Sequence, residues 1–414
     1  MKVEIITIGD EILIGQTVDT NSAWMASKLN EIGVRVNRIN SISDEAGSII
    51  TTLEEAFRRV DLVLMTGGLG PTNDDITKKT LSRHFGMELK MNEEVLADIT
   101  AFFTSRGKGM LQMNSDQALL PEGAVVLRNY KGTASGMWFE RDGKSVVSMP
   151  GVPYEMEHLM ETGVIPRIIE KYKTTPVFHH TLMTFGEGES FIAERIKEWE
   201  ASLSGTGVKL AYLPSPGIVK LRLSAFGPDK SLLELSVMRK VAELEVLIPE
   251  LIYGHNDETM EKVVSNLLKT KGLRIATAES CTGGYIAHLL TSIAGSSAYY
   301  EGSFCTYSYR SKSEILGVDE DLILHQGAVS GEVVQAMVKG VFTHFHTDYA
   351  IAVSGIAGPD GGTLEKPVGT VWMCVGTKEN QVTQCFHFGK DRMRNIRMTA
   401  LHALNLVRLS ILAS

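Results

Sequence analysis

The feature that most constrains the fold is the fully apolar run Leu62–Met65, which leads directly into the glycine-rich loop Thr66–Gly70 and then into a helix predicted over Thr77–Phe85. A strand without a polar face fits a parallel sheet that helices cover on both sides. The same order of strand, loop and helix recurs throughout residues 1–172 and again throughout residues 257–414. The sequence therefore predicts an α/β protein with two three-layer α/β/α domains.

Strand and helix signals support this alternation in both regions. Apolar runs rich in β-branched residues predict strands, and apolar residues at intervals of three and four predict helices. In the first region we expect strands at Lys2–Ile8 and Val34–Ile39, helices at Asn21–Gly33 and Ile49–Val60, and a hairpin that turns at Asp142 and Gly143. In the last region we expect strands at Leu273–Thr277, Ser303–Tyr307, Tyr349–Val353, Thr370–Val375 and Val382–Phe388, with helices at Met260–Leu268, Tyr285–Ile293, Val333–Phe345 and from Arg394 onward.

The stretch between these two domains has a different rhythm. Residues 177–252 predict a strand, a helix, two strands and a second helix, which together make a small α+β domain. Its turn Gly186–Glu189 is acidic and would repel phosphate, so we expect no RNA binding there. The polar, turn-forming residues Tyr253–Asp257 predict a linker at which the flanking domains can be separated.

Composition narrows the class of protein. The net charge of −8 argues against nucleic acid as the main partner, because nucleic-acid binding needs a clustered positive surface. The chain begins MKVEIITIGDEI, whose acids predict a buried strand rather than a signal peptide, and no run of about eighteen apolar residues predicts a membrane span. The four cysteines have no Cys-x-x-Cys spacing. We therefore expect a reduced, cytoplasmic protein without a zinc ribbon.

A serine follows the first predicted strand of the last domain. The strand Leu273–Thr277 ends in Ala278–Gly284, and a helix begins at once. A hydroxyl at that position lies at a helix N-terminus, where backbone amides can stabilise developing negative charge. Ser280 could instead be only a helix cap, and the G-x-S-x-G elbow of α/β-hydrolases is absent because residue 278 is alanine. Cys281 is a rival nucleophile.

Two further loops follow buried strands in this domain. After Ser303–Tyr307 comes Lys312, and a lysine with a lowered pKa can serve as the base for a serine when histidine is missing. Lys312 could also be a solvated residue in the first turn of a helix. The third loop, Ser354–Gly362, is glycine-rich, and ligands of open α/β sheets bind at that edge.

The glycine-rich loop of the first domain continues into Asp74 and Asp75. Amides of such a loop bind anions, and paired aspartates beside it suit Mg²⁺, which prefers carboxylates together with phosphate oxygens and water. The alternative is a solvated pair that caps the following helix.

Three long motifs of the last domain carry a specific resemblance. They read AESCTGGYIAHLLTSIAGSSAYYEGSFCTYSYRSK, GAVSGEVVQAM and SGIAGPDGGTLEKPVGTVW, and residues 257–412 resemble the C-terminal domain of the CinA (competence/damage-inducible) family almost without gaps. The resemblance implies a serine amidohydrolase that converts nicotinamide mononucleotide to nicotinic acid mononucleotide and ammonia without a cofactor, in bacterial pyridine nucleotide salvage. It implies these site residues: nucleophile Ser280, base Lys312, helper Tyr307, and substrate contacts Gly283, Gly284, Ser354, Gly355 and Arg392.

The implied chemistry is acyl transfer. Neutral Lys312 takes the Ser280 proton, either directly or through Tyr307, and the backbone amides of the glycine turns hold the oxyanion. Arg392 is expected at the substrate phosphate. Lys390 stands where the family often has glycine directly before Asp-Arg, so this sequence departs from the family pattern next to Arg392.

The first domain carries a second resemblance. ITIGDEILIGQTVDTNSAWMASKL, TGGLGPTNDDIT and SMPGVPYEM resemble the molybdopterin-binding fold of MogA and MoeA, which in CinA proteins implies a metal-dependent ADP-ribose pyrophosphatase. The implied phosphate or nucleotide site comprises Gly67, Gly68, Gly70, Asp44 and Asp75, and the implied Mg²⁺ ligands are Asp44, Asp74 and Asp75. Pro150–Pro153 matches the proline-glycine loop of that fold, and residues 177–252 resemble the KH-like insert of the family.

Other functions stay open on the sequence alone. The family name also fits a non-catalytic partner protein of DNA uptake or repair, and the first domain could handle molybdopterin rather than ADP-ribose. The resemblance further implies a homodimer that acts on small nucleotides.

Overall fold

The computed structural model describes residues 1–72, 74–172 and 174–413. The chain forms two compact units, one of Met1–Phe178 with Phe226–Glu234 and the other of His179–Ala225 with Leu235–Ser414. Each unit contains its own sheets and cores, and each is described by itself below.

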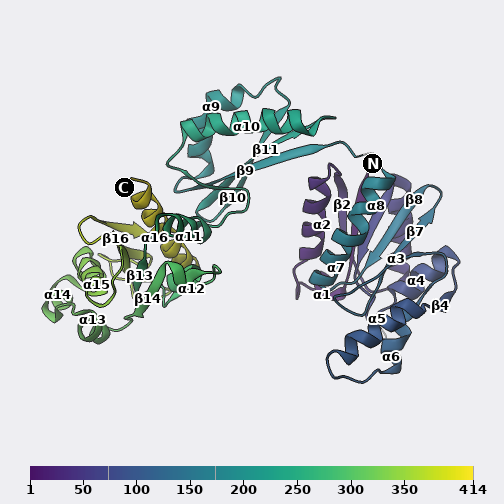
Figure 1. Cartoon of the computed structure of the whole chain (residues 1–414), viewed down its shortest axis with the longest axis horizontal. Helices are drawn as coiled ribbons and strands as arrows, with labels where there is room; N and C mark the ends of the chain where they lie inside the picture. The colour runs from purple at the N-terminus through teal and green to yellow at the C-terminus, as the bar shows by residue number, and fades with distance from the viewer. Residues whose placement is uncertain (73, 173, 414) are drawn as a thin grey trace. The chain divides into compact units, whose positions relative to one another are not determined.

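A six-stranded sheet organises the first unit (Figure 1). Its strand order is β2-β1-β3-β8-β7-β6, where β2 is Val36–Ile42, β1 Val3–Ile8, β3 Leu62–Thr66, β8 Lys144–Met149, β7 Gly136–Arg141 and β6 Val125–Leu127. The first four strands are parallel, and β7 and β6 are antiparallel. The β7–β8 hairpin turns at Asp142 and Gly143, whose φ angles of 53° and 75° confirm the predicted turn.

Successive residues of these strands enter two different cores. Ile6, Val63 and Met65 pack on one face of the sheet, and Ile5 and Leu64 pack on the other, all fully buried. Helices α3 (Ala46–Arg59), α4 (Thr77–Phe85) and α5 (Glu93–Thr104) supply the first core. Helices α2 (Thr20–Glu31), α7 (Pro153–Leu159) and α8 (Ile165–Lys171) supply the second, with the π-helical turn Met160–Val164 between α7 and α8. The predicted three-layer architecture is confirmed.

The second unit begins with a four-stranded sheet of order β10-β11-β9-β12. Its strands are β9 (Val177–Phe185), β10 (Val208–Ser215), β11 (Ile218–Phe226) and β12 (Ile252–His255), with helices α9 (Glu189–Ala201) and α10 (Lys230–Leu247). The α+β pattern predicted for residues 177–252 is confirmed, and β12 is an additional strand.

The predicted linker Tyr253–Asp257 is a turn only in part, because its first three residues belong to strand β12. Strand β12 pairs antiparallel with β9, and the Tyr253 side chain is only 5% exposed. Met183 and Phe185 of β9 and Tyr253 of β12 belong to the same hydrophobic core as the C-terminal helices. A short polar sequence is typical of a turn when it is considered alone. Here the edge of β9 is available to pair with it, and the segment forms a strand instead.

The buried Arg408 adds a polar connection to the same region. Its guanidinium donates to the carbonyl oxygens of Glu250 at 2.9 Å and Ile252 at 3.0 Å. Arg408 is 3% exposed and burial lowers its pKa, so these carbonyl groups replace the water that the guanidinium loses.

The C-terminal sheet has the order β14-β13-β15-β16-β17. Strands β13 (Ile275–Glu279), β14 (Tyr300–Cys305) and β15 (Tyr349–Gly355) are parallel, and β16 (Thr370–Gly376) and β17 (Gln381–His387) are antiparallel. Helices α11 (Met260–Lys271), α12 (Tyr285–Thr291) and α16 (Arg392–Ala413) cover one face, and α13 (Tyr309–Leu316), α14 (Glu320–Gln326) and α15 (Gly331–His344) cover the other. This confirms the second three-layer domain.

Helix α16 is the one described helix whose length and composition would allow it to cross a membrane. It packs on β15 and β16 and on α11, and Ala400, Leu404 and Val407 are fully buried. Its apolar residues therefore serve as core residues of the C-terminal domain.

Candidate active site

Ser280 and Lys312 meet at the carboxyl edge of the C-terminal sheet. Ser280 directly follows β13, and Lys312 lies one turn into α13, which Ser308 caps. Lys312 Nζ lies 3.0 Å from Ser280 Oγ and donates a second hydrogen bond, 2.8 Å long, to the carbonyl oxygen of Thr306. The structure thus brings together the predicted nucleophile and base.

Lys312 is buried rather than solvated. Its side chain is 1% exposed, and no carboxylate forms an ion pair with it among the described residues. Burial lowers the pKa of Lys312 to about 8, because the interior disfavours the ammonium form. A lysine in this state can act as a base near neutral pH.

The geometry favours Ser280 over the neighbouring thiol. Burial raises the pKa of Cys281 to about 12, so the thiol stays protonated at neutral pH. Ser280 is 8% exposed and already contacts the amine that can take its proton.

The turn between β13 and α12 depends on two glycines. Gly283 and Gly284 have φ angles of 61° and 96°, which other residues rarely adopt. An added Cβ at either position would meet open space, so backbone conformation rather than packing explains these glycines.

Three amides of this segment, those of Gly284, Ile286 and Ala287, are not free to hold an oxyanion. The carboxylate of Glu279 accepts hydrogen bonds from the amides of Gly284, Ile286 and Ala287 at 3.1, 3.1 and 2.8 Å. A buried acid satisfies the start of α12 before any substrate arrives.

The third loop packs against the same edge. The Ser354 hydroxyl is 1% exposed and donates to the carbonyl oxygen of Ala328 at 2.6 Å. A Cβ on Gly355 would lie 2.6 Å from a methyl group of Val371, so this glycine allows β15 and β16 to pack. The predicted substrate contacts Ser354 and Gly355 thus lie at the end of β15. Ser354 donates a hydrogen bond to Ala328, and Gly355 lies against Val371.

Tyr307 pairs with Arg392 rather than with the dyad. Arg392 Nη2 donates to the Tyr307 hydroxyl at 2.9 Å, and Nη1 donates to the Gly358 carbonyl oxygen at 2.7 Å. No hydrogen bond joins the Tyr307 hydroxyl to Ser280 or Lys312 among the described residues. Arg392 therefore connects the loop after β14 to the loop after β15, and its exposed guanidinium can also reach a ligand.

The first unit has a separate pocket of about 360 Å³ at the carboxyl edge of its sheet. The predicted glycines Gly67, Gly68 and Gly70 line it together with Asp44, Asp74, Asp75, Pro150, Gly151 and Glu155. Gly67 has a φ of 114°, and a Cβ there would lie 2.1 Å from the carbonyl oxygen of Ile8. The backbone therefore approaches β1 as closely as only glycine permits.

The predicted Mg²⁺ ligands do not form one compact group. Among residues 1–72, 74–172 and 174–413, no three His, Cys, Asp or Glu side chains are arranged to hold a metal ion. Asp75 instead accepts hydrogen bonds from the amide and hydroxyl of Thr72, at 2.9 and 2.5 Å. These hydrogen bonds stay within the loop, and Asp75 does not cap α4, whose N-cap residue Ile76 has no side-chain cap hydrogen bond.

Asp44 lies among other acids of this pocket. Burial raises the pKa of Asp44, and the negative charges of Asp10, Glu11 and Asp74 raise it further. Clustered carboxylates of this kind repel one another until a cation is present. Asp44 and Asp74 thus fit an ion that takes one or two carboxylates and obtains its other ligands from phosphate and water.

Known proteins are similar to this chain over nearly its whole length. The sequence is 46% identical to a CinA-like protein from Cytophaga hutchinsonii, over 98% of this chain and 97% of that protein. It is 44% identical to a CinA-like protein from Flavobacterium psychrophilum, over 100% and 99%. The chain belongs to the CinA family. Family profiles match in three segments: the probable molybdopterin binding domain at residues 4–170, the damage-inducible protein CinA KH domain at 179–254 and the CinA C-terminal domain at 257–411.

Solved structures of CinA proteins resemble part of the chain. A CinA superfamily protein from Klebsiella pneumoniae is 32% identical and covers 38% of this chain and 100% of its own, with a TM-score of 0.37. The protein CinA from Thermoplasma acidophilum is 34% identical and covers 40% and 96%, with a TM-score of 0.37.

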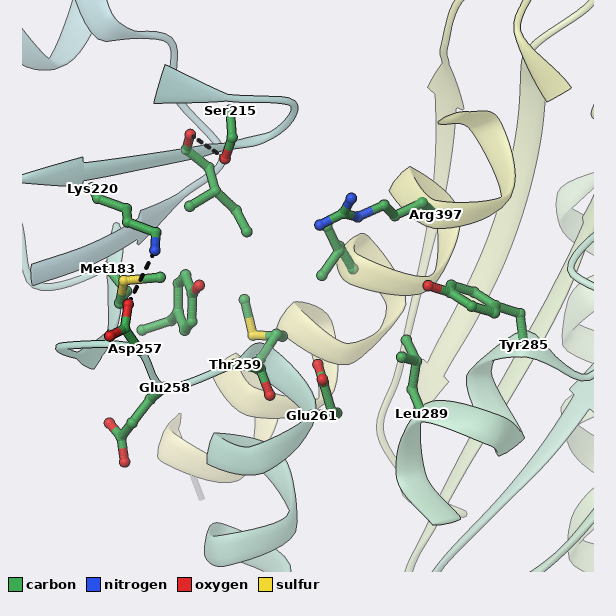
Figure 2. A pocket seen from close by; sticks show the side chains of 14 residues that line it. Met183, Ser215, Lys220, Asp257, Glu258, Thr259, Glu261, Tyr285, Leu289 and Arg397 are labelled. Carbon is green, nitrogen blue, oxygen red and sulfur yellow. Dashed lines mark hydrogen bonds and ion pairs between the residues drawn. The ribbon is translucent and has the colours of Figure 1, made fainter. Parts of the chain in front are cut away.

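This CinA chain has a further pocket, of about 260 Å³, in its second unit (Figure 2). Lys220 lies on one side of it, 3.2 Å from Asp257, and Arg397 of α16 lies on another. Glu258 and Glu261 also line the pocket, so its charges are mixed. None of the predicted site residues lines it, and its lining gives no reason to place a phosphate there.

Two buried acids of this CinA chain were missed by the sequence analysis. Glu279 is fully buried at the end of β13, and Glu155 is 7% exposed in the pocket of the first unit. Burial raises the pKa of Glu155, and Asn129 Nδ2 donates to its carboxylate at 2.5 Å. The sequence signal for Glu279 was available, because an acid inside a buried strand needs a partner.

Proposed function

We propose that the C-terminal domain is a serine amidohydrolase that deamidates nicotinamide mononucleotide. One observation carries this proposal: the amine of Lys312 is buried, has no carboxylate partner in the described part of the chain, and lies 3.0 Å from the hydroxyl of Ser280. A structural lysine is normally exposed or paired with an acid, because burial of an unpaired ammonium is costly. Contact with a serine hydroxyl instead suits proton transfer.

Acylation begins when neutral Lys312 Nζ takes the proton from Ser280 Oγ. The oxygen attacks the carboxamide carbon of the substrate, and a tetrahedral oxyanion forms. As the C–N bond breaks, Lys312 gives its proton to the leaving nitrogen, which departs as ammonia. The product of this half-reaction is an ester between the Ser280 oxygen and the nicotinoyl group.

Deacylation repeats the same steps with water. Lys312 takes a proton from water, the hydroxide attacks the ester carbon, and the proton returns to Ser280 Oγ as the ester bond breaks. Nicotinic acid mononucleotide leaves as a carboxylate. Both halves need the same base, which is consistent with a single lysine beside the serine.

The substrate phosphate has a candidate ligand in Arg392. Its two hydrogen bonds, to Tyr307 and to the Gly358 carbonyl oxygen, hold the guanidinium at the rim of the site. Guanidinium groups bind phosphate through paired N–H donors. On this proposal Tyr307 orients Arg392, and Lys312 acts on Ser280 directly.

The experiment that tests the proposal measures both products. Purified full-length chain is incubated with nicotinamide mononucleotide, and ammonia and nicotinic acid mononucleotide are quantified. Equal amounts of the two products from wild type, and none from Ser280→Ala, support the proposal. If the folded wild-type chain makes neither product, the proposal is wrong, and a non-catalytic partner protein becomes the better account.

A second activity is supported for the first unit by its own pocket. We propose metal-dependent ADP-ribose pyrophosphatase chemistry there, because Gly67 and Gly68 bring backbone close to a pocket that also contains Asp44 and Asp74. A divalent ion bound by these acids would neutralise the charge of the pyrophosphate. Release of AMP from ADP-ribose tests this proposal. Binding of a molybdopterin without such turnover would favour a pterin-handling domain instead.

A further inference from the structure

Glu279 is a fully buried acid placed immediately before the nucleophile. It lies at the end of β13, where its neighbours in the sheet are Cys305 of β14 and Val353 of β15. No lysine or arginine forms an ion pair with it in the part of the chain that the structure describes. Its carboxylate must therefore be stabilised by hydrogen bonds alone.

Most of these hydrogen bonds come from the segment that follows Ser280. One carboxylate oxygen, Oε2, accepts from the Thr282 hydroxyl at 2.6 Å and from the amides of Gly284 and Ile286, each at 3.1 Å. The other oxygen, Oε1, accepts from the amide of Ala287 at 2.8 Å and from the Thr277 hydroxyl, within β13, at 3.4 Å. One side chain thus holds both the turn and the first residues of α12.

Most of the other amides in the turn from Ser280 to Tyr285 also have hydrogen-bond partners. The amide of Ser280 donates to Val353, that of Gly283 to Ser280, and that of Tyr285 to Thr282. Only the amides of Cys281 and Thr282 make no hydrogen bond to another residue within the described turn from Ser280 to Tyr285. These two N–H groups directly follow the nucleophile.

We propose that Glu279 is a positioning residue, which orders the turn so that the amides of Cys281 and Thr282 hold the oxyanion formed on attack by Ser280. This inference rests on the amidohydrolase activity proposed above. Glu279 itself touches neither substrate nor Ser280 Oγ. Its carboxylate accepts hydrogen bonds from the amides of Gly284, Ile286 and Ala287. These bonds hold the turn in an arrangement in which the adjacent amides of Cys281 and Thr282 are available.

The length and charge of glutamate both matter for this role. Both carboxylate oxygens of Glu279 accept hydrogen bonds. Glutamine would replace one of these oxygens with an N–H₂ group, which cannot accept, so the hydrogen bonds to that oxygen would be lost. Aspartate keeps the charge, but its shorter side chain cannot reach the same donors without movement of the turn. Both substitutions should disturb the oxyanion-holding amides while leaving Lys312 and Arg392 in place.

The experiment compares Glu279→Gln and Glu279→Asp with wild type in the full-length chain. We expect kcat for ammonia release to fall about 100-fold, which is the usual effect of losing one oxyanion donor, with KM unchanged within about threefold. Affinity for pyridine-3-boronic acid, whose adduct with serine resembles the tetrahedral intermediate, should fall in parallel with kcat. Glu4→Gln is the matched control, because Glu4 is equally buried but pairs with Arg59 in the other unit.

The results distinguish failure of the proposed deamidase activity from failure of the proposed role of Glu279. If wild type releases no ammonia, the proposed function fails, whatever Glu279 does. If wild type is active and either folded variant keeps kcat within threefold, Glu279 does not position the turn. The proposal is also overturned if kcat falls while boronate affinity is retained, or if both variants leave the C-terminal domain unfolded, because Glu279 then serves folding alone.

Discussion

Lys312 Nζ lies 3.0 Å from Ser280 Oγ, although Ser280 follows β13 and Lys312 lies in α13, with α12 and β14 between them in the chain. Parallel strands β13 and β14 are neighbours, so the segments that follow them meet at one sheet edge. This is the general location of ligand sites in open α/β sheets.

Replacement of Ser280 with alanine should abolish deamidation and leave the fold intact, because a single oxygen is removed. Cys281→Ala should keep at least about a third of the activity, since burial raises the pKa of that thiol to about 12. Initial rates of ammonia release, with circular dichroism as the folding control, check both variants. Loss of activity in Cys281→Ala alone would reverse the assignment of the nucleophile.

Lys312→Arg should be nearly as inactive as Lys312→Ala, with kcat at least about 1000-fold below wild type. The guanidinium keeps a positive charge at that position but cannot be deprotonated in a protein. Single-turnover kinetics measure the acylation step directly. Substantial activity in the arginine variant would mean that Lys312 supplies only charge.

The rate of deamidation should depend on pH through Lys312. Its pKa is lowered to about 8, so kcat/KM should rise tenfold per pH unit below that value and level off above it. A pH profile of kcat/KM between 6 and 9.5 tests this. A rate that is flat across pH 7–9 would contradict the role of Lys312 as a base.

Burial of the Lys312 amine should also lower the free energy of unfolding. The folded-state pKa of about 8 lies below the unfolded value of 10.5, so between these values the unfolded chain binds a proton that the folded chain does not. Stability should therefore rise with pH across that window. At pH 7 the inactive variant Lys312→Met should be more stable than wild type by roughly 1–3 kcal/mol, measured by urea denaturation. A less stable variant would show that the hydrogen bonds of Lys312 outweigh its burial.

Asp44, proposed to bind the metal ion, and Asp75, which is bonded to Thr72, should behave differently. Asp44→Asn should raise the Mg²⁺ concentration needed for half-maximal ADP-ribose cleavage at least about tenfold, because Asp44 faces the other acids of the pocket. Asp75→Asn should lower the rate without that shift, because Asp75 holds Thr72. Ammonia release in the presence of a chelator is the control, and chelator-sensitive deamidation would contradict the division of chemistry between the two units.

Separation of the chain at Tyr253–Asp257 stays a prediction, and the packing of β12 predicts what it would cost in stability. A fragment starting at residue 257 would lose the carbonyl groups that accept from Arg408 and the apolar side chains of Met183, Phe185 and Tyr253. It should unfold at a temperature about 5–10 °C below that of a fragment starting at residue 179. Equal melting temperatures would show that this shared core contributes little.

Much of the fold could be predicted because local signals agree with the tertiary structure. Strand Leu62–Thr66, the Asp142–Gly143 hairpin and both three-layer domains all follow from apolar periodicity and turn residues. Strand β12 could not be predicted, because its pairing with β9 depends on residues about seventy positions away.

The candidate site was predictable in part. Ser280 and Lys312 follow from motifs that place each of them at a strand end, and the structure brings them together. The hydrogen bonds of Glu279 could not be read from the sequence, because they require the chain to reverse at Gly283 and Gly284 and present three amides to one carboxylate.

The central claim is that Ser280 attacks the carboxamide, and trapping the acyl-enzyme tests it most directly. Full-length chain is mixed with nicotinamide mononucleotide, quenched in acid within one turnover, digested, and examined by mass spectrometry. We predict a nicotinoyl mononucleotide ester on the peptide that contains Ser280, at a level that falls in Lys312→Arg and is absent in Ser280→Ala. An adduct on Cys281, or release of ammonia from a Ser280→Ala chain, would contradict the account.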